Sequence, residues 1–150
     1  MADSQKQNII NSIFSKKNSK SSAQLGEIYV SHIKVWEDDD GGGKKPRYLI
    51  VSVTNDGYGF IRKAKLNING SFSVGKIWRL EEMCGVKIVN PLEFTFTIRK
   101  IYRWQSEKEA DQATFLKALI RLFRTITNRT AALKLEGTET LGIGRWILTR

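Results

Sequence analysis

The feature of this sequence that most constrains its fold is a change in the spacing of its apolar residues. From residue 27 to about residue 105, apolar side chains recur at every second position, in seven short runs separated by turn residues. Beyond these runs the apolar residues recur at the wider spacing of a helix. Period two is typical of half-buried strands, and the wider period is typical of an amphipathic helix. Strands first and one helix last predict a mostly β domain that contains a C-terminal helix.

Seven short strands at this spacing predict a barrel or a sandwich, and the helix can cover an open barrel end. The expected strands are residues 27–36, 47–53, 58–68, 70–80, 85–89, 92–98 and 100–105. The fourth is expected to alternate, with one face made by Phe72, Val74, Lys76, Trp78 and Leu80. Ser106 and Glu109 have the spacing of a capping box at the start of the helix. The apolar stripe of that helix is Ala113, Leu116, Leu119, Ile120, Phe123 and Ile126.

The two ends of the chain differ from the middle. Residues 1–26 are polar apart from a short amphipathic helix, whose apolar side is Ile9, Ile10, Ile13 and Phe14. So short a helix is marginal alone in water, so we expect it to dock on its own domain, with a partner or a membrane as alternatives. Near the other end the pattern fades. The expected organisation is an N-terminal extension (1–26), one domain (27–128) and a tail (129–150).

Composition and charge narrow the classes of function. The chain has 150 residues, 41% of them hydrophobic, and a net charge of +10. Such a charge favours an anionic partner, either nucleic acid or a phospholipid surface, although solubility alone is the alternative reading. Cys84 is the only cysteine, and the sequence has neither an apolar signal core near its start nor a run of about 18 apolar residues. We therefore expect a cytoplasmic protein.

Residue types that carry catalysis are scarce. His32 is the only histidine, so with one cysteine there is no basis for a metal centre or a nucleophile–base pair. The acidic run from Glu37 to Asp40 is interpreted as a solvated loop, because four adjacent carboxylates cannot all point toward one ion. The sequence predicts no enzyme, no metal and no cofactor.

Basic residues are instead concentrated between residues 44 and 76, where seven lysines and arginines accompany a single acidic residue. Period two places Lys63 and Lys65 on one face of the third strand and turns Arg62 to the other. The three glycines at 41–43 predict a flexible loop that carries further cations toward this face. We expect a basic cup at one barrel mouth, suited to a ligand with several phosphates. Its members are Lys45, Arg47, Lys63, Lys65 and Lys76. The alternative is a charged edge that deters strand pairing.

Three stretches carry a resemblance to a known family: "KKPRYLIVSV", "IRKAKLNINGSFSVGKIWRLEEM" and "YRWQSEKEADQATFLKALIRLF". They resemble the N-terminal lipid-binding domain of the exocyst subunit Sec three (exocyst component one), and the similarity runs from about "NIINSIFS" to Ile126. The resemblance implies a pleckstrin-homology fold, a seven-stranded partly open barrel closed by one helix. It also implies that Lys45, Arg47, Lys63, Lys65 and Lys76 bind phosphatidylinositol 4,5-bisphosphate at the inner face of the plasma membrane.

The same resemblance implies a role in polarised exocytosis, as a peripheral membrane-recruitment module of the vesicle-tethering exocyst. A Rho-family small GTPase is an implied partner, with Ile13 and Phe14 in the extension as candidate contacts. The family's long helical rod, which assembles with other exocyst subunits, is absent from this chain. Two departures stand out: Lys65 and Lys76 replace the arginines of some relatives, and Pro46 interrupts a basic run.

Two further hypotheses come from other classes. A basic β-barrel could bind single-stranded nucleic acid if Trp36, Trp78 and Trp104 stacked on bases. Trp78 and Trp104 are in phase with apolar residues, however, which favours core positions, and we expect no nucleic-acid partner. A protein-interaction module without lipid binding is the other alternative, because fold alone does not determine function.

Overall fold

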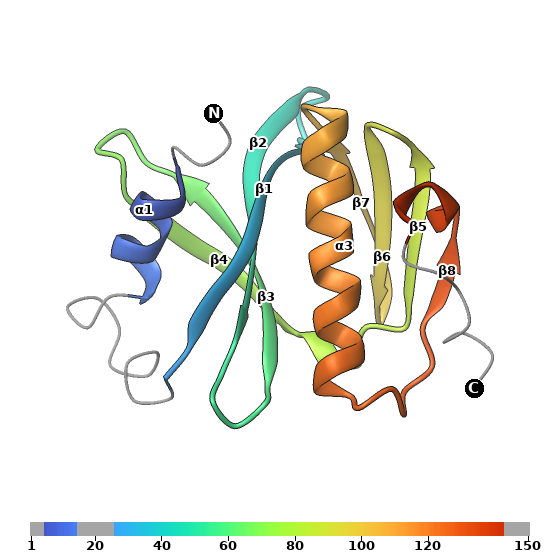
Figure 1. Cartoon of the computed structure of the whole chain (residues 1–150). Coiled ribbons are helices and arrows are strands. Elements are labelled where there is room, and N and C mark those ends of the chain that lie inside the picture. Colours follow the sequence, from blue (N-terminus) through green and yellow to red (C-terminus); the bar gives the residue numbers. More distant parts are fainter. Residues whose placement is uncertain (1–4, 15–25, 143–150) are drawn as a thin grey trace.

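The computed structural model describes residues 5–14 and 26–142, which form one bent sheet with a helix lying across it (Figure 1). The strands follow the order β4-β3-β2-β1-β7-β6-β5-β8 across the sheet. Seven of them correspond to the strands expected from the sequence, and an eighth follows the helix. Their bounds are β1 (Ile28–Asp38), β2 (Lys44–Val53), β3 (Gly59–Leu66), β4 (Phe72–Arg79), β5 (Gly85–Asn90), β6 (Glu93–Ile98), β7 (Lys100–Ser106) and β8 (Lys134–Glu136).

The sheet forms a barrel that stays open along one side. The strands β1–β4 pair as antiparallel neighbours in sequence order, and so do β5–β7. The two halves meet where β1 pairs with β7, at Val35↔Ser106 and Trp36↔Gln105. In this order β4 and β8 are the two edge strands and do not pair with each other, so the barrel is open between them. The expected partly open, mostly β architecture is confirmed.

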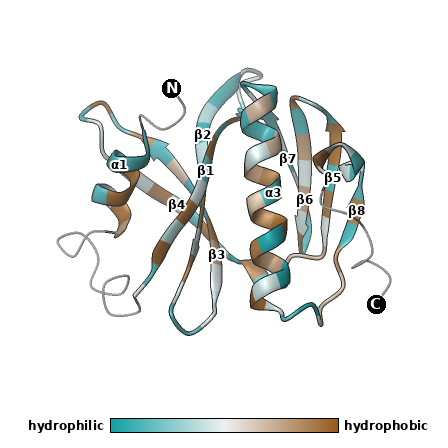
Figure 2. Ribbon diagram, in the orientation of Figure 1, coloured by the Kyte–Doolittle hydropathy of each residue, from teal (hydrophilic) through white to brown (hydrophobic). Residues whose placement is uncertain are grey.

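The helix α3 (Glu109–Ile126) covers the interior of the barrel between the two halves of the sheet (Figure 1). Leu116, Leu119, Ile120 and Phe123 are no more than 1% exposed and pack into the main core. The expected apolar stripe is therefore confirmed, and Phe115 adds a buried ring to it. In Figure 2 the hydrophobic side of α3 alternates with a hydrophilic one, as an amphipathic helix requires.

The capping box predicted at the start of this helix is wrong. The helix begins at Glu109, and Lys108 at its N-cap position makes no side-chain capping hydrogen bond. Ser106 is instead the last residue of β7, and its hydroxyl donates to Gln112 Oε1 at 2.6 Å. Gln112 also donates to the Asn90 carbonyl at 2.8 Å. Because the Ser106 hydroxyl is bonded to Gln112, it does not cap the helix.

The strand β4 departs from the alternation that its sequence predicts. Lys63 pairs with Lys76, but Ala64 pairs with Val74, so Gly75 is an extra residue that forms a β-bulge. Because of this bulge Trp78 lies in the main core, whereas Phe72 packs on the opposite face of the sheet. The prediction that Phe72, Val74, Lys76, Trp78 and Leu80 share one face is therefore wrong. The sequence did contain a signal for this bulge, because an isolated glycine inside a strand, here Gly75, often marks one.

That opposite face is covered by the N-terminal helix, which consists of α1 (Lys6–Ile9) and the π-helical turn η2 (Ile10–Phe14). Ile9 and Ile13 are buried there in an outer cluster with four sheet residues: Tyr48, Ile50, Ala64 and Phe72. Ser12 Oγ also accepts a hydrogen bond from the Phe72 N–H at 3.1 Å. The expectation that this helix docks on its own domain is confirmed.

A buried ion pair lies beside the outer cluster. Arg62 Nη2 donates to Glu27 Oε1 at 3.0 Å, and Arg62 Nη1 contacts Glu27 Oε2 and also donates to Ser52 Oγ at 3.0 Å. The side chains of Glu27 and Arg62 are 2% and 10% exposed. Arg62 points away from the barrel interior, as period two predicts, and its guanidinium lies 5.3 Å from the ring centre of Phe14.

The segment expected to be a tail contains regular structure. The strand β8 pairs in parallel with β5, and the 3₁₀ turn η4 (Thr138–Leu141) follows it. Leu133 and Leu141 are 7% and 4% exposed and belong to the main core. Sequence periodicity missed this contribution because a three-residue strand is too short to show a period. Another 3₁₀ turn, η3 (Leu80–Glu82), links the two halves of the sheet.

Candidate functional site

The basic cup continues the inner face of the barrel beyond the apolar core. On β2, Leu49 and Val51 belong to the core, and alternation places Arg47 and Lys45 on the same face. On β3, Ile61 belongs to the core and Lys63 and Lys65 follow on the same face. Lys76 lies directly opposite Lys63 in the β3–β4 ladder. The expected sharing of one face by Lys63 and Lys65, with Arg62 on the other, is confirmed.

Three of the five cations of the cup, Lys45, Arg47 and Lys63, contact one carboxylate, that of Glu37. Lys63 Nζ donates to Glu37 Oε1 at 3.0 Å. Glu37 Oε2 lies 3.4 Å from Arg47 Nε and 3.7 Å from Lys45 Nζ. Because Lys63 and Lys76 are like charges in facing positions, a nearby negative charge stabilises their arrangement. Part of the cup is thus built around one partly buried anion, whose side chain is 16% exposed.

Sequence analysis placed Glu37 in a solvated loop, and that interpretation is wrong. Glu37 and Asp38 are the last residues of β1, and Glu37 is paired with Lys45 across the β1–β2 ladder. The signal for its position was the alternation of Ile33 and Val35, which places Glu37 on the same inner face. Because Glu37 is followed directly by three aspartates, the whole run was interpreted as a loop and the alternation was overlooked.

The basic segment that follows the glycines is also a strand and not a flexible loop. The strand β2 begins at Lys44, and the turn before it is closed by hydrogen bonds from Asp39 N–H to the Gly43 carbonyl (2.7 Å) and from Gly42 N–H to the Asp39 carbonyl (2.9 Å). Lys44 Nζ donates to Asp38 Oδ1 at 2.7 Å. This hydrogen bond holds the pKa of Asp38 below its usual value. Lys45 and Arg47 are therefore held in position by the β1–β2 ladder.

An aromatic floor, made by Trp78, Tyr102 and Trp104, lies under part of the cup. Lys76 Nζ is 5.6 Å from the ring centre of Trp78 and 5.4 Å from that of Tyr102. Lys63 Nζ is 6.0 Å from the ring centre of Trp104. The Trp78 indole and then the Lys76 ammonium lower the pKa of Tyr102. Such contacts hold flexible ammonium groups over a rigid surface.

Sequence reasoning missed Lys100, which belongs beside the cup. Its Nζ lies 5.1 Å from the ring centre of Tyr102, the same ring that Lys76 contacts. Lys100 is two residues before Tyr102 in β7, so period two already placed both on one face. Lys100 was missed because it lies far in sequence from the basic segment at residues 44–76.

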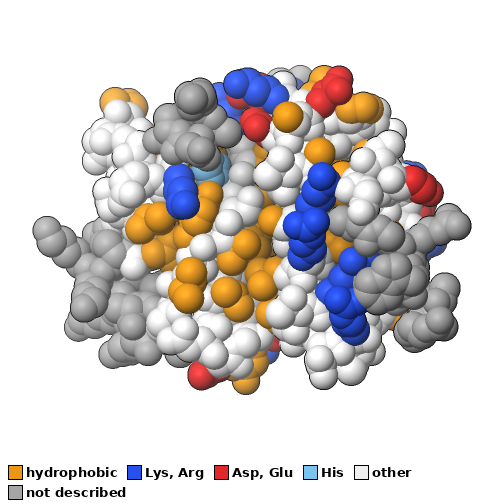
Figure 3. Space-filling model, in the orientation of Figure 1, with side chains coloured by type: hydrophobic (Ala, Val, Ile, Leu, Met, Phe, Trp, Pro, Cys, Tyr) orange, Lys and Arg blue, Asp and Glu red, His pale blue; other side chains and the backbone are white. Residues whose placement is uncertain are grey.

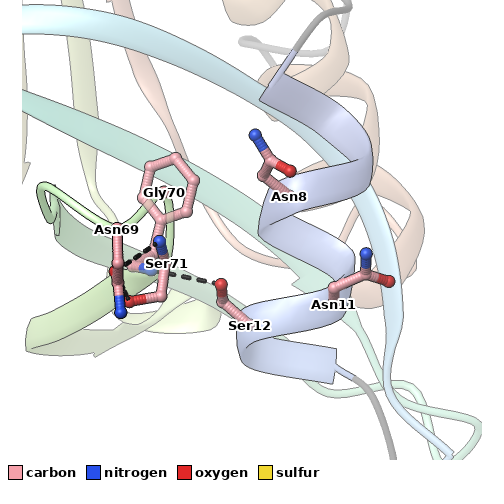
Figure 4. A pocket seen from close by; sticks show the side chains of 7 residues that line it. Asn8, Asn11, Ser12, Asn69, Gly70 and Ser71 are labelled. Atoms are coloured by element: carbon pink, nitrogen blue, oxygen red, sulfur yellow. Dashed lines mark hydrogen bonds between the residues drawn. The ribbon is translucent and has the colours of Figure 1, made fainter.

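The two residues proposed to contact a GTPase have different environments. Ile13 is 6% exposed and packs into the outer cluster, whereas Phe14 is only partly buried beside Arg62. Apolar side chains gather on the surface between α1 and α3 (Figure 3). A polar hollow lies between the N-terminal helix and the β3–β4 turn (Figure 4). Its volume is about 510 Å³, and it is lined by Asn8, Asn11, Ser12, Asn69, Gly70, Ser71 and Phe72.

Other kinds of site find little support in the described part of the chain. Trp78 and Trp104 are 5% and 2% exposed, so they present no open ring face on which a base could stack. Residues 5–14 and 26–142 hold no cluster of three or more histidine, cysteine or acidic side chains suited to a metal ion. Over the same residues, no helix is long and apolar enough to cross a membrane.

Comparison with known proteins gives one family match. The model of the exocyst complex component SEC3 N-terminal PIP2-binding PH domain matches residues 42–125, more than half of the chain. No curated protein is similar enough to count as a match.

Several solved structures are distantly similar, including the following two. The Ran-binding domain of the nuclear complex component Nup2 from Ashbya gossypii has a TM-score of 0.47 and 14% identity, covering 67% of this chain and 98% of that one. The hSac2 domain of the human phosphoinositide phosphatase Sac2 has a TM-score of 0.43 and 9% identity, covering 73% of this chain and 76% of that one. At such scores neither similarity bears on function.

Proposed function

This chain belongs to the family of exocyst SEC3 N-terminal PIP2-binding PH domains, and we propose that its basic cup holds the bisphosphorylated headgroup of that lipid. The family is a non-enzymatic lipid-binding module that recruits the exocyst to membranes, and it associates with them peripherally. In this chain, the residues proposed to contact the phosphates are Lys45, Arg47, Lys63, Lys65 and Lys76.

The observation that carries this proposal is the convergence of cations from two strands on a single carboxylate. Lys63 from β3 and Arg47 and Lys45 from β2 all lie within 3.7 Å of Glu37 oxygens. A group of cations that gathers around one anion is spaced to gather around a phosphate as well. Lys76 and Lys100 over the aromatic floor supply positive charge beside it for a second phosphate.

Vesicle co-sedimentation tests the cup. We expect Lys63→Glu combined with Lys65→Glu to weaken binding to bisphosphate-containing vesicles by more than about thirtyfold, since each cation near an anionic leaflet contributes about 1 kcal/mol. The matched control is Lys87→Glu with Arg121→Glu, two exposed cations of β5 and α3. The control makes the same change in net charge away from the cup. Equal loss in both variants would show that total charge, and not the cup, determines binding.

We further propose that the domain acts at the inner face of the plasma membrane, at sites of polarised secretion. Regions outside this chain would then join it to other exocyst subunits. This localisation follows from the lipid, because a domain selective for phosphatidylinositol 4,5-bisphosphate concentrates where that lipid is found. A fluorescent fusion of the chain should leave the cell periphery when the lipid is depleted, and the Lys63→Glu, Lys65→Glu variant should not reach it.

A Rho-family GTPase is proposed to bind over the N-terminal helix and the neighbouring barrel surface. The support is the apolar surface between α1 and α3 (Figure 3) and the partial exposure of Phe14. Phe14→Ser should weaken capture of the GTP-loaded GTPase and leave vesicle binding unchanged. Ile13→Ser should also loosen the helix, because Ile13 is buried. Undiminished capture by both variants would place the GTPase elsewhere.

A further inference from the structure

We propose that Glu37 is a built-in competitor for the phosphate site, so that a ligand must displace its carboxylate before the cup can close on a phosphate. This inference rests on the proposed function, since it takes the cup as the place where the headgroup binds. The inference assigns to Glu37 a role that opposes binding. A ligand must then carry enough negative charge to displace the Glu37 carboxylate.

The geometry is that of an occupied anion site. Both carboxylate oxygens of Glu37 are engaged: Oε1 accepts from Lys63 Nζ at 3.0 Å, and Oε2 lies near Arg47 Nε and Lys45 Nζ. The side chain comes from the inner face of β1, and the three cations come from β2, which pairs with β1, and from β3, the next strand in the sheet. Carboxylate and phosphate oxygens are bound by the same donors, so the two groups compete for them.

Burial makes the competition effective. The side chains of Glu37, Arg47 and Lys63 are 16%, 21% and 24% exposed, so salt screens their interactions less than it screens those of surface charges. A single phosphate carries a charge of about −1.5 to −2 at neutral pH, so it brings at most about one negative charge more than the carboxylate it would replace. A headgroup with two or more phosphates brings enough to displace Glu37 and to reach Lys76 as well. The cup should therefore favour polyphosphorylated ligands over singly charged ones.

Isothermal titration with soluble inositol 1,4,5-trisphosphate tests the idea in the full chain. Glu37→Gln should tighten binding by about tenfold, as expected when a partly buried ion pair no longer has to be broken. The control is Asp40→Asn, which makes the same change in net charge in the exposed β1–β2 turn. Because Asp40 is exposed, solvent and salt screen its charge, so its effect should be limited to roughly twofold.

The other results are equally informative. If Glu37→Gln and Asp40→Asn tighten binding alike, Glu37 acts through net charge alone and the inference is wrong. Weaker binding by Glu37→Gln would mean that Glu37 positions the cations and does not compete. If the wild-type chain binds neither the soluble headgroup nor bisphosphate vesicles, the proposed function itself fails.

A second measurement needs no variant. In the wild-type chain, the ¹³C signal of the Glu37 carboxylate and the ¹⁵Nζ signal of Lys63 report their contact directly. Saturating inositol 1,4,5-trisphosphate should shift both signals, the carboxylate toward the position of a solvated glutamate. A Glu37 signal that stays unchanged while Lys63 shifts would overturn the displacement, even if Glu37→Gln did not fold.

Discussion

At the scale of single residues, the positions of charges matter more than their number. Glu27 and Arg62 form a nearly buried pair, whereas Lys44 and Asp38 form a pair whose side chains are 51% and 78% exposed. An exposed pair is held loosely and is screened by solvent, so it contributes little to stability. A buried pair has given up its hydration, and removing one partner leaves the other charge stranded.

Arg62→Ala should accordingly lower the free energy of unfolding by about 3–5 kcal/mol, because Glu27 would remain buried without its counter-charge. Lys44→Ala should change it by no more than about 1 kcal/mol. Urea unfolding followed by tryptophan fluorescence measures both values. Similar small losses for the two variants would show that water reaches Glu27 readily once the arginine is removed.

Two tyrosines should ionise in a set order. Burial raises the pKa of Tyr48, whereas the Trp78 indole and the Lys76 ammonium lower the pKa of Tyr102. As pH rises, ionisation of Tyr102 therefore adds stability, while stability contributed by neutral Tyr48 is lost. In a ¹³Cζ NMR titration Tyr102 should ionise before Tyr48. Inositol 1,4,5-trisphosphate should raise the pKa of Tyr102, since its phosphates neutralise Lys76; an unchanged value would place the ligand away from the aromatic floor.

At the scale of elements, α3 is the part of the core on which both halves of the sheet depend. It packs against β1 and β3 in one half and against β7 in the other. A helix in this position closes the interior, so a cavity in its buried side weakens the whole barrel.

Leu119→Ala tests this dependence. Leu119 is fully buried, so its truncation should cost about 2–5 kcal/mol, which is a large share of the stability of a small domain. Arg121→Ala, two residues along the helix on its exposed side, is the control and should melt close to the wild-type temperature. Equal melting temperatures for Leu119→Ala and the wild type would mean that α3 does not close the barrel.

The accuracy of sequence reasoning also varied by element. Strands and the helix were located because their apolar residues repeat over several periods, as in the stripe through Leu119 and Phe123. The bulge at Gly75 and the short strand β8 were missed because one residue, or three, cannot establish a period. In the cup, alternation placed Lys63 and Lys65 correctly. Alternation also indicates the faces of Glu37 and Lys100, but it does not show which side chains of other strands they contact.

At the scale of the whole molecule, the segment after α3 completes the domain. Leu133 and Leu141 fill the core next to β5, and Lys134 N–H donates to the Cys84 carbonyl at 3.0 Å. The domain boundary expected near residue 128 would remove both leucines.

A chain that ends after residue 130 should therefore be less stable than one that ends after residue 142. The loss of two buried leucines alone corresponds to about 3–6 kcal/mol. Thermal melts of the two chains, with Leu133→Ala in the longer chain as an intermediate case, measure the difference. Equal melting temperatures would support the boundary near residue 128.

The two faces of β2 and β3 are occupied separately, and this has a consequence for signalling. The basic cup opens on the inner face of β2 and β3, while the N-terminal helix covers the outer face of the same strands. A headgroup in the cup and a protein bound over that helix would not exclude one another sterically. Each could raise the residence time of the other through avidity. The domain would then act as a coincidence detector, held firmly only where the lipid and the protein signal occur together.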